Sequence, residues 1–212
     1  METNTKNYSV SKPLASICIQ IDADKVDSLI KKIKNEENFN LNVGEIVIFS
    51  IVKALKDFPM FNSIYDQNLI LYDSINLGHF VNLGNGPKLA VIKDADTKNL
   101  YQIAQEIKES ALKYIRGELL NDQTALSTVS VTNLSSSQVF QVLPPVYEHQ
   151  SSMFSIASKF ISGDETKYVN KFNLTLSYDA RVADCQTAIK FLNVITKMLE
   201  GGTDQFNWSS VE

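Results

Sequence analysis

Hydrophobic residues recur along the chain at two spacings, one typical of helices and the other of strands. In "ADKVDSLIKKIKN" they fall at every third or fourth position, whereas "VGEIVIFSIVKALKDF" is apolar on nearly all sides, which is typical of a buried helix. We expect Asp24 to cap the first of these helices and the second to end before Pro59. The pattern predicts four helices: 23–35, 43–58, one between Thr97 and Arg116, and one from about Ala183 to Leu199.

Shorter apolar runs between these segments predict strands. The glycines of "LGNGPK" permit a tight hairpin between two of them. No repeat, linker or low-complexity segment interrupts the alternation of helices and strands. The sequence therefore predicts an α/β sandwich with a mixed rather than a purely parallel sheet. The predicted strands are 14–22, 68–73, 75–84, 87–94, 127–134, 152–160 and 172–179.

The composition narrows the class of protein. A chain of 212 residues suits one domain over 1–212, with 1–11 and 201–212 expected as flexible tails. A net charge of −4 without a basic patch argues against nucleic acid as a partner. Cys18 and Cys185 are far apart and show no metal-ligand spacing, which favours a reducing compartment. Since no apolar run has the roughly 20 residues of a membrane span, we expect a soluble cytoplasmic protein without a membrane partner.

The stretch "LTLSYDARVADC", residues 174–185, is the richest in candidate chemistry. It places two aspartates, an arginine and a cysteine directly after an apolar strand. It contains no histidine, the residue that most often transfers protons at neutral pH. The stretch therefore looks like a site that lacks an obvious base.

Five segments in the same order resemble the catalytic domain of the acyltransferase component of 2-oxo acid dehydrogenase complexes. They are "FSIVKALKDFPMFNS", "INLGHFVNLGNGPKLAVIKDAD", "LYQIAQEIKESALKYIRGEL", "VSVTNL" and "LTLSYDARVADCQTAIKFLNVITKMLE". The resemblance covers about 12–199. It implies the two-layer fold of chloramphenicol acetyltransferase, which the condensation domains of peptide synthetases share more distantly, and a substrate channel between the subunits of a trimer.

In that family the last strand ends in D-H-R-x-x-D/N-G, where the histidine is the general base that takes the thiol proton of coenzyme A. A hydroxyl in T-x-S/T-N-L donates to the oxyanion of the tetrahedral intermediate. This chain has Ala180 in place of the histidine and Cys185 in place of the glycine, and "SSSQ" replaces the glycine-rich continuation after N-L. It matches the pattern at Asp179, Arg181, Asp184, Thr132 and Asn133.

Each candidate for the chemistry has a structural alternative. His79 can replace the missing base or be a histidine bonded within the core, and His149 in its turn can be solvated. Cys185 can be a nucleophile near a helix start or a small buried residue. Asp184 can transfer protons or cap a helix, and Thr132 can be an ordinary strand residue. We assign catalysis to Thr132, Asp184 and His79, and substrate binding to Asn133, Arg181, Asp179, Cys185 and His149, with Asp179 and Arg181 also expected as an ion pair.

Two functions are compatible with this pattern. The first is a repurposed enzyme that hydrolyses, eliminates from or cyclises an acyl thioester in a biosynthetic pathway. It needs no bound cofactor, and coenzyme A or a carrier-protein phosphopantetheine arm would carry the substrate. The second is an inactive structural or regulatory subunit that assembles with an active acyltransferase. Because the chain has neither lipoyl nor subunit-binding domains and ends in "EGGTDQFNWSSVE", we expect a homotrimer rather than a large cage.

Overall fold

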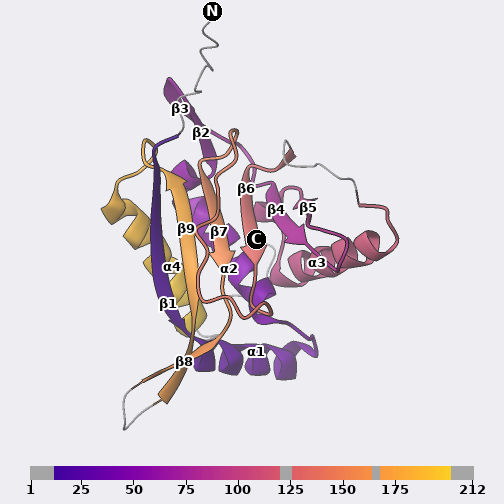
Figure 1. Cartoon of the computed structure of the whole chain (residues 1–212). Coiled ribbons are helices and arrows are strands. Elements are labelled where there is room, and N and C mark those ends of the chain that lie inside the picture. Colours follow the sequence, from indigo (N-terminus) through magenta and orange to yellow (C-terminus); the bar gives the residue numbers. More distant parts are fainter. Residues whose placement is uncertain (1–11, 120–125, 164–167, 202–212) are drawn as a thin grey trace, which may run out of the picture.

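The computed structural model describes residues 12–119, 126–163 and 168–201. Helices and strands alternate along this chain, as the hydrophobic periodicity predicts (Figure 1). The expected tail 1–11 and residues 202–212 of the expected tail 201–212 lie outside the described residues. The helices are α1 (Ala23–Glu37), α2 (Val43–Asp57), α3 (Leu100–Ile115) and α4 (Cys185–Glu200), with short 3-10 helices at Pro59–Phe61 and Ala95–Thr97. The strands are β1 (Leu14–Asp22), β2 (Ser63–Asp66), β3 (Asn68–Leu71), β4 (Leu77–Val81), β5 (Lys88–Ile92), β6 (Val129–Asn133), β7 (Ser152–Ile156), β8 (Phe160–Gly163) and β9 (Tyr168–Asp179).

The main sheet is mixed. Its strand order is β1-β9-β7-β6-β4-β5, and β8 adds to β9 outside this path. The central pairs β7–β6 and β6–β4 are parallel, whereas the pairs β1–β9, β9–β7 and β4–β5 are antiparallel. The prediction of a mixed α/β sandwich is confirmed. A separate hairpin of β2 and β3 projects beyond the end of the sheet (Figure 1).

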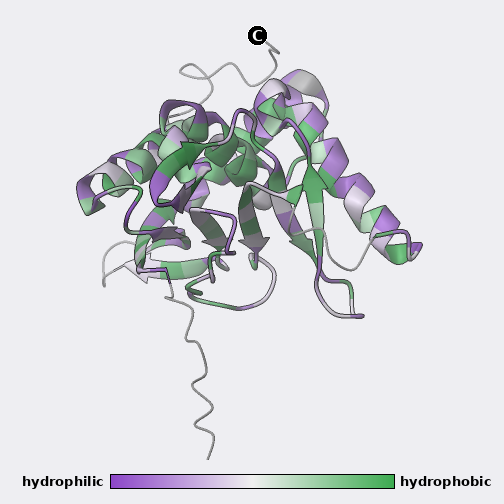
Figure 2. Ribbon diagram, turned by 90° about the horizontal axis from the view of Figure 1, so that it is seen from above, coloured by the Kyte–Doolittle hydropathy of each residue, from purple (hydrophilic) through white to green (hydrophobic). Residues whose placement is uncertain are grey.

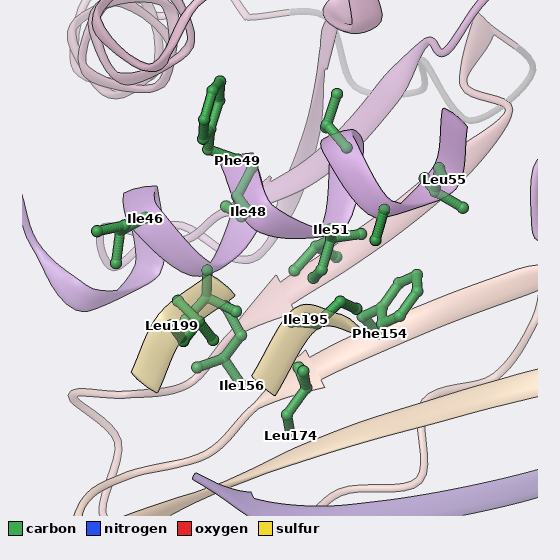
Figure 3. Close-up of a cluster of buried hydrophobic side chains, with 14 of the residues drawn as sticks. Ile46, Ile48, Phe49, Ile51, Leu55, Phe154, Ile156, Leu174, Ile195 and Leu199 are labelled. Carbon is green, nitrogen blue, oxygen red and sulfur yellow. The ribbon is translucent and has the colours of Figure 1, made fainter. Parts of the chain in front are cut away.

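The helices pack against one face of the sheet, and α2 forms the centre of this layer (Figure 1). Eleven of its fifteen residues are buried, which explains why its sequence is apolar on nearly every side. Figure 3 shows Ile46, Ile48 and Ile51 of α2 close to side chains from strands β7 and β9 and from helix α4. Burying such side chains is the main favourable contribution to folding. The outer helices alternate between hydrophobic and hydrophilic segments (Figure 2).

The helix ends follow their capping residues. Asp22, not Asp24, caps α1, since its carboxylate accepts the N–H groups of Asp24 and Lys25 at 3.0 and 3.1 Å. The prediction for Asp24 was wrong by two residues, because each of these aspartates precedes an apolar stripe at helical spacing. Asp24 instead accepts hydrogen bonds from Asn170. The second helix ends at Asp57, before Pro59, as predicted.

Two strand predictions differ from the structure in detail. The four-residue strand β2 was not predicted, since it pairs only with β3 in a hairpin whose central residue, Gln67, has a φ of 58°. The predicted strand 152–160 ends at Ile156, and β8 begins separately at Phe160. The hairpin between β4 and β5 is confirmed, with positive φ at Gly84 and Gly86. Within the described residues, no helix is long and apolar enough to cross a membrane.

Candidate functional site

The face of the sheet opposite the helices is lined by polar side chains, and we call it the polar face. It arises because β9 alternates polar and apolar residues, so that its apolar residues face the helices. The register places four polar residues side by side across four strands: Cys18 of β1, Thr175 of β9, Ser155 of β7 and Thr132 of β6. The other members are Ser16, Gln20, Asn173, Ser177 and Ser130.

The segment that follows β6 covers part of this face. Ser155 donates its hydroxyl to the carbonyl of Val142 at 2.7 Å, and the amide of Asn173 donates to the carbonyl of Phe140 at 2.8 Å. At its far end, Gln150 is fully buried and donates to the hydroxyls of Ser127 and Ser130. These bonds give partners to the hydroxyl of Ser155 and to the amide N–H groups of Asn173 and Gln150, as buried polar groups require. The hydroxyl of Thr175, which is also buried on this face, has no hydrogen-bond partner among the described residues.

The turn after β9 is held by an ion pair between two residues that are two positions apart in the sequence. The Arg181 guanidinium donates two hydrogen bonds to the buried Asp179 carboxylate, at 2.8 and 2.5 Å, and lies 4.6 Å from the centre of the Tyr65 ring. Burial raises the pKa of Asp179, but hydrogen bonds from Arg181 outweigh it and hold the pKa below its ordinary value. The expected ion pair is confirmed. Between the two residues Ala180 is exposed, and its N–H donates to the carbonyl of Pro13 at 2.7 Å.

Asp184 caps α4. Its carboxylate accepts the backbone N–H of Thr187 at 2.7 Å, and this hydrogen bond is the main reason that its pKa is lowered. The capping interpretation is thus confirmed, while proton transfer by Asp184 stays a prediction. Cys185 is the first residue of α4, and its thiol is free and exposed. The expectation of a small buried cysteine was wrong, because the residue lies on the outer side of the first helical turn.

Thr132 and Asn133 point to opposite sides of the sheet. Thr132 is half-buried on the polar face beside Ser155. The side chain of Asn133 lies at the start of α2, where it fits only because residue 44 is glycine: a β-carbon on Gly44 would be 2.0 Å from the Asn133 amide nitrogen. The Asn133 side-chain oxygen also accepts the N–H of Ser135 at 3.1 Å. The Asn133 side chain is therefore held in place by two contacts, its close packing against Gly44 and its hydrogen bond from Ser135.

His79 lies on the helix side of the sheet. It pairs in register with Val131 and Ala90, both of which are buried, and its Nε2 is 3.2 Å from the hydroxyl of Ser110 on α3. Burial lowers the pKa of His79 to about 4, so the ring is neutral at pH 7. The structure thus matches the alternative of a histidine bonded within the core. A catalytic role for His79 stays a prediction that this position does not favour.

His149 is half-buried in the turn before β7, and its carbonyl accepts the hydroxyl of Tyr72 at 2.7 Å. Its ring stacks at 6.1 Å from the ring of Tyr147. The same turn is bound by Lys12, whose ammonium donates to the carbonyls of Tyr147, Glu148 and Gln150. A solvated turn histidine was expected for His149, whereas the aromatic contact shields part of it from water.

Comparison with known proteins identifies the family. A family model described as 2-oxoacid dehydrogenases acyltransferase (catalytic domain) matches residues 3–206, nearly the whole chain. The chain belongs to this family. The acyltransferase component of the acetoin cleaving system of Bacillus subtilis is 28% identical over 194 residues, which are 87% of this chain and 49% of that protein. The acyltransferase-family chain thus spans about half the length of the curated relatives it matches.

Solved structures agree with this assignment. A probable dihydrolipoamide acetyltransferase from Listeria monocytogenes superposes on this acyltransferase-family chain with a TM-score of 0.80 at 27% identity, covering 93% of this chain and 88% of that one. Chloramphenicol acetyltransferase superposes with a TM-score of 0.59 at 12% identity, over 90% of this chain and 88% of that one, which shows the shared fold. The predicted family and fold are both confirmed.

Several residues of the candidate site were not predicted from the sequence. The alternation in "NLTLSYD" indicates that Thr175 and Ser177 share a face, but the register that brings Thr175 beside Ser155 has no local signal. Lys12 also has no local signal, since its partners are about 135 residues away. Six of the eight sequence-predicted residues form two groups: Asp179, Arg181, Asp184 and Cys185 at the turn, and Thr132 and Asn133 at the end of β6. His79 lies on the helix side of the sheet, and His149 lies in the turn before β7.

Proposed function

We propose that this domain acts on an acyl thioester, carried by coenzyme A or by the phosphopantetheine arm of a carrier protein, and has lost ordinary transfer between lipoamide and coenzyme A. The supporting observation is Ala180, which stands where the related pattern has its histidine base, within a turn whose Asp179–Arg181 pair is intact. Alanine cannot accept a proton. Because general-base catalysis contributes about 10²- to 10⁴-fold, ordinary transfer should fall by a similar factor.

Hydrolysis is the simplest reaction for the remaining groups. The oxygen of a water molecule would bond to the acyl carbon, the carbon–sulfur bond would break, and the thiol would leave with a proton. The Thr132 hydroxyl, half-buried on the polar face, would donate to the carbonyl oxygen as negative charge develops there. An intramolecular nucleophile in place of water would give cyclisation. Loss of a proton from one carbon of the acyl chain, together with departure of a leaving group from the next carbon, would form a double bond and give elimination.

The proton would pass through Asp184 or a second water molecule. Hydrogen bonds from the backbone of Thr187 keep the pKa of Asp184 low, so its carboxylate is ionised at neutral pH and is a weak base. His79 takes no part in this proposal, because its side chain and that of Thr132 lie on opposite faces of the sheet. Because this carboxylate is a weaker base than histidine, we expect the proposed reaction to be slower than ordinary acyl transfer.

We further propose that the chain forms a homotrimer and that two neighbouring subunits form each site. Within one chain, Thr132 is aligned with Thr175, and the turn begins at Asp179, four residues or roughly 13 Å further along β9. Asp184 lies beyond that turn, so Thr132 needs an Asp184 from a second copy. The exposed side chains of Leu69, Ile70 and Leu71 on β3 support assembly, since exposed apolar residues in a row favour an interface.

The first test is thiol release from acetyl-CoA, longer acyl-CoA and acyl-pantetheine by the purified chain. We expect turnover that Thr132→Ala and Asp184→Ala each reduce without changing the oligomeric mass in solution. Thr196→Ala is the matched control, since Thr196 is half-buried on α4, away from the polar face, and its hydroxyl donates to the carbonyl of Leu192. Unchanged rates in the Thr132 and Asp184 variants would contradict the assignment.

Mixing the two inactive variants tests the shared site. When Thr132→Ala and Asp184→Ala chains are unfolded and refolded together in equal amounts, about a quarter of the sites in a random trimer combine both intact residues. We expect activity to return in the mixture and not in either variant refolded alone. Activity that never returns would place both residues in the same chain or outside the reaction.

The alternative function is an inactive subunit that assembles with an active acyltransferase. The capping role of Asp184 and the position of His79 favour it, because neither is a strong base on the polar face. Absence of turnover with every thioester, together with co-elution with an active acyltransferase core, would establish this function in place of the first.

A further inference from the structure

A cavity of 570 Å³ lies between the start of α2, the segment after β6 and the connection from β7 to β8. This volume is within the range of about 300–1,000 Å³ that is typical of small-molecule sites. None of the residues assigned above to catalysis or substrate binding lines it. The described lining residues are Asn42, Val43, Ser135, Ser136, Gln138, Val139, Phe140, Ala157, Ser158, Lys159, Phe160 and Phe172.

Hydrogen bonds fix the walls of this cavity in place. Ser158 is bound on both sides, because its N–H donates to the carbonyl of Val139 at 2.9 Å and its hydroxyl donates to the carbonyl of Leu134 at 2.9 Å. The N–H of Val139 in turn lies 3.1 Å from the Ser158 hydroxyl oxygen. On the opposite side, Asn42 is held in the capping box of α2 with Glu45. A ligand would therefore meet a preformed site and would not need to order it.

The interior of the cavity is apolar and partly aromatic. Phe172 is fully buried and Ala157 nearly so, which gives the cavity a floor without polar side chains. Phe140 and Phe160 form an aromatic wall, with ring centres 4.9 Å apart. Phe140 is 57% exposed. Contact between its ring and water is unfavourable, and a bound apolar group would cover part of this exposed area.

One cationic side chain of the lining bears on the charge of a ligand. Among the described lining residues, Lys159 is the one with an ionisable side chain, and Ser135 and Ser136 add hydroxyl groups. The Lys159 ammonium binds the two carboxylate oxygens of Asp27 at 2.7 and 2.6 Å. An ammonium has three N–H donors, so an acidic ligand can share Lys159 with Asp27.

We propose that this cavity is a binding site for a small carboxylic acid with an apolar, aromatic-sized body. The body lies against Phe140, Phe160 and Phe172, and the carboxylate lies at Lys159. The site is separate from the thioester site of the proposed function and does not depend on it. It can influence that site through one connection, since Ser135 binds the Asn133 side chain directly after Thr132.

Calorimetric titration with 3-phenylpropanoate tests the proposal, and 3-phenylpropanamide is the uncharged probe of the same shape. We expect the wild type to bind the acid about three- to tenfold more tightly than the amide, the range suited to a partly exposed charge pair. Lys159→Gln should remove this preference. Asp27→Asn, which frees the ammonium, should keep or increase it.

A second pair of variants tests the location. Ser136 lines the cavity and Ser137 does not, yet both are exposed in the same turn, so either position accepts a larger side chain without disturbing the core. Ser136→Phe should abolish binding and Ser137→Phe should preserve it. The proposal is overturned if neither probe binds at millimolar concentration, if Ser136→Phe binds as the wild type does, or if acid and amide bind equally.

Discussion

His79 and Thr132 lie on adjacent parallel strands of the sheet, and their side chains point to opposite faces. His79 is aligned with Val131, and both contribute to the helix side, so the next residue, Thr132, belongs to the polar face. The backbone of the main sheet thus lies between the His79 ring and the Thr132 hydroxyl, which the family pattern assigns to stabilising the oxyanion. Any proton exchanged near Thr132 must come from water or from a group on the polar face.

The buried His79 predicts acid sensitivity. Its pKa is about 4 in the folded chain and about 6.5 in the unfolded chain, so below pH 6.5 the unfolded state binds more protons. The His79 contribution is complete at pH 7 and falls by about 3 kcal/mol as the pH decreases to 4. We expect urea unfolding curves of the wild type and His79→Gln to show this loss as a shrinking difference in unfolding free energy. Parallel pH profiles would contradict the assignment.

Restoring the histidine predicts a gain of function. Ala180 is exposed, and its backbone is fixed by Pro13 and by the flanking Asp179–Arg181 pair, so a larger side chain fits without a core rearrangement. Ala180→His should raise acetyl transfer from acetyl-CoA to dihydrolipoamide by about 10²- to 10⁴-fold, the usual contribution of a general base. Ala180→Gln controls for size and polarity. Equal rates in the two variants would show that the channel no longer aligns both thiols.

The contact between Gly44 and Asn133 predicts a coupled pair of variants. Gly44→Ala places a β-carbon 2.0 Å from the Asn133 amide nitrogen, so the side chain must move and lose its bond to Ser135. The helix itself gains up to about 1 kcal/mol from alanine. We expect Gly44→Ala with Asn133→Ala to be more stable than Gly44→Ala alone in chemical denaturation. Additive single effects would show that the clash relaxes by another route.

The Asp179–Arg181 pair predicts unequal effects of its two partners. Arg181→Met leaves a buried carboxylate without its guanidinium, whereas Asp179→Asn removes the charge that requires it. Arg181→Met should therefore lower the melting temperature more, and adding Asp179→Asn should recover part of the loss. Since the folded pKa of Asp179 is depressed, this contribution is present above about pH 3.9 and is lost as the pH falls below it. A double variant no more stable than Arg181→Met would contradict this account.

Hydrophobic periodicity predicted the helices well because each buries one continuous stripe or, for α2, almost every side. It did not predict β2, whose four residues pair with one other short strand and make few core contacts. It also misplaced the cap of α1, since Asp22 and Asp24 both precede the same stripe and only the backbone conformation distinguishes them.

The site was less predictable than the fold. Residues close in sequence, such as Asp179 and Arg181, could be paired by local reasoning, and the pairing is correct. The row from Thr132 to Thr175 depends on strand register, which a one-residue shift would reverse, and the bonds of Lys12 depend on distant carbonyls. The family pattern identified positions in the chain, and only the fold revealed which faces they share.

The burial of α2 on nearly all sides has a consequence for how the molecule opens. Its central amides, from Ile46 to Leu55, lie between the sheet and the other helices, so no local fraying exposes them to solvent. Their hydrogen exchange should be the slowest in the chain and should report its full cooperative opening. The β2–β3 hairpin, with few buried residues, should exchange orders of magnitude sooner, which makes it the first region to probe for assembly by protection.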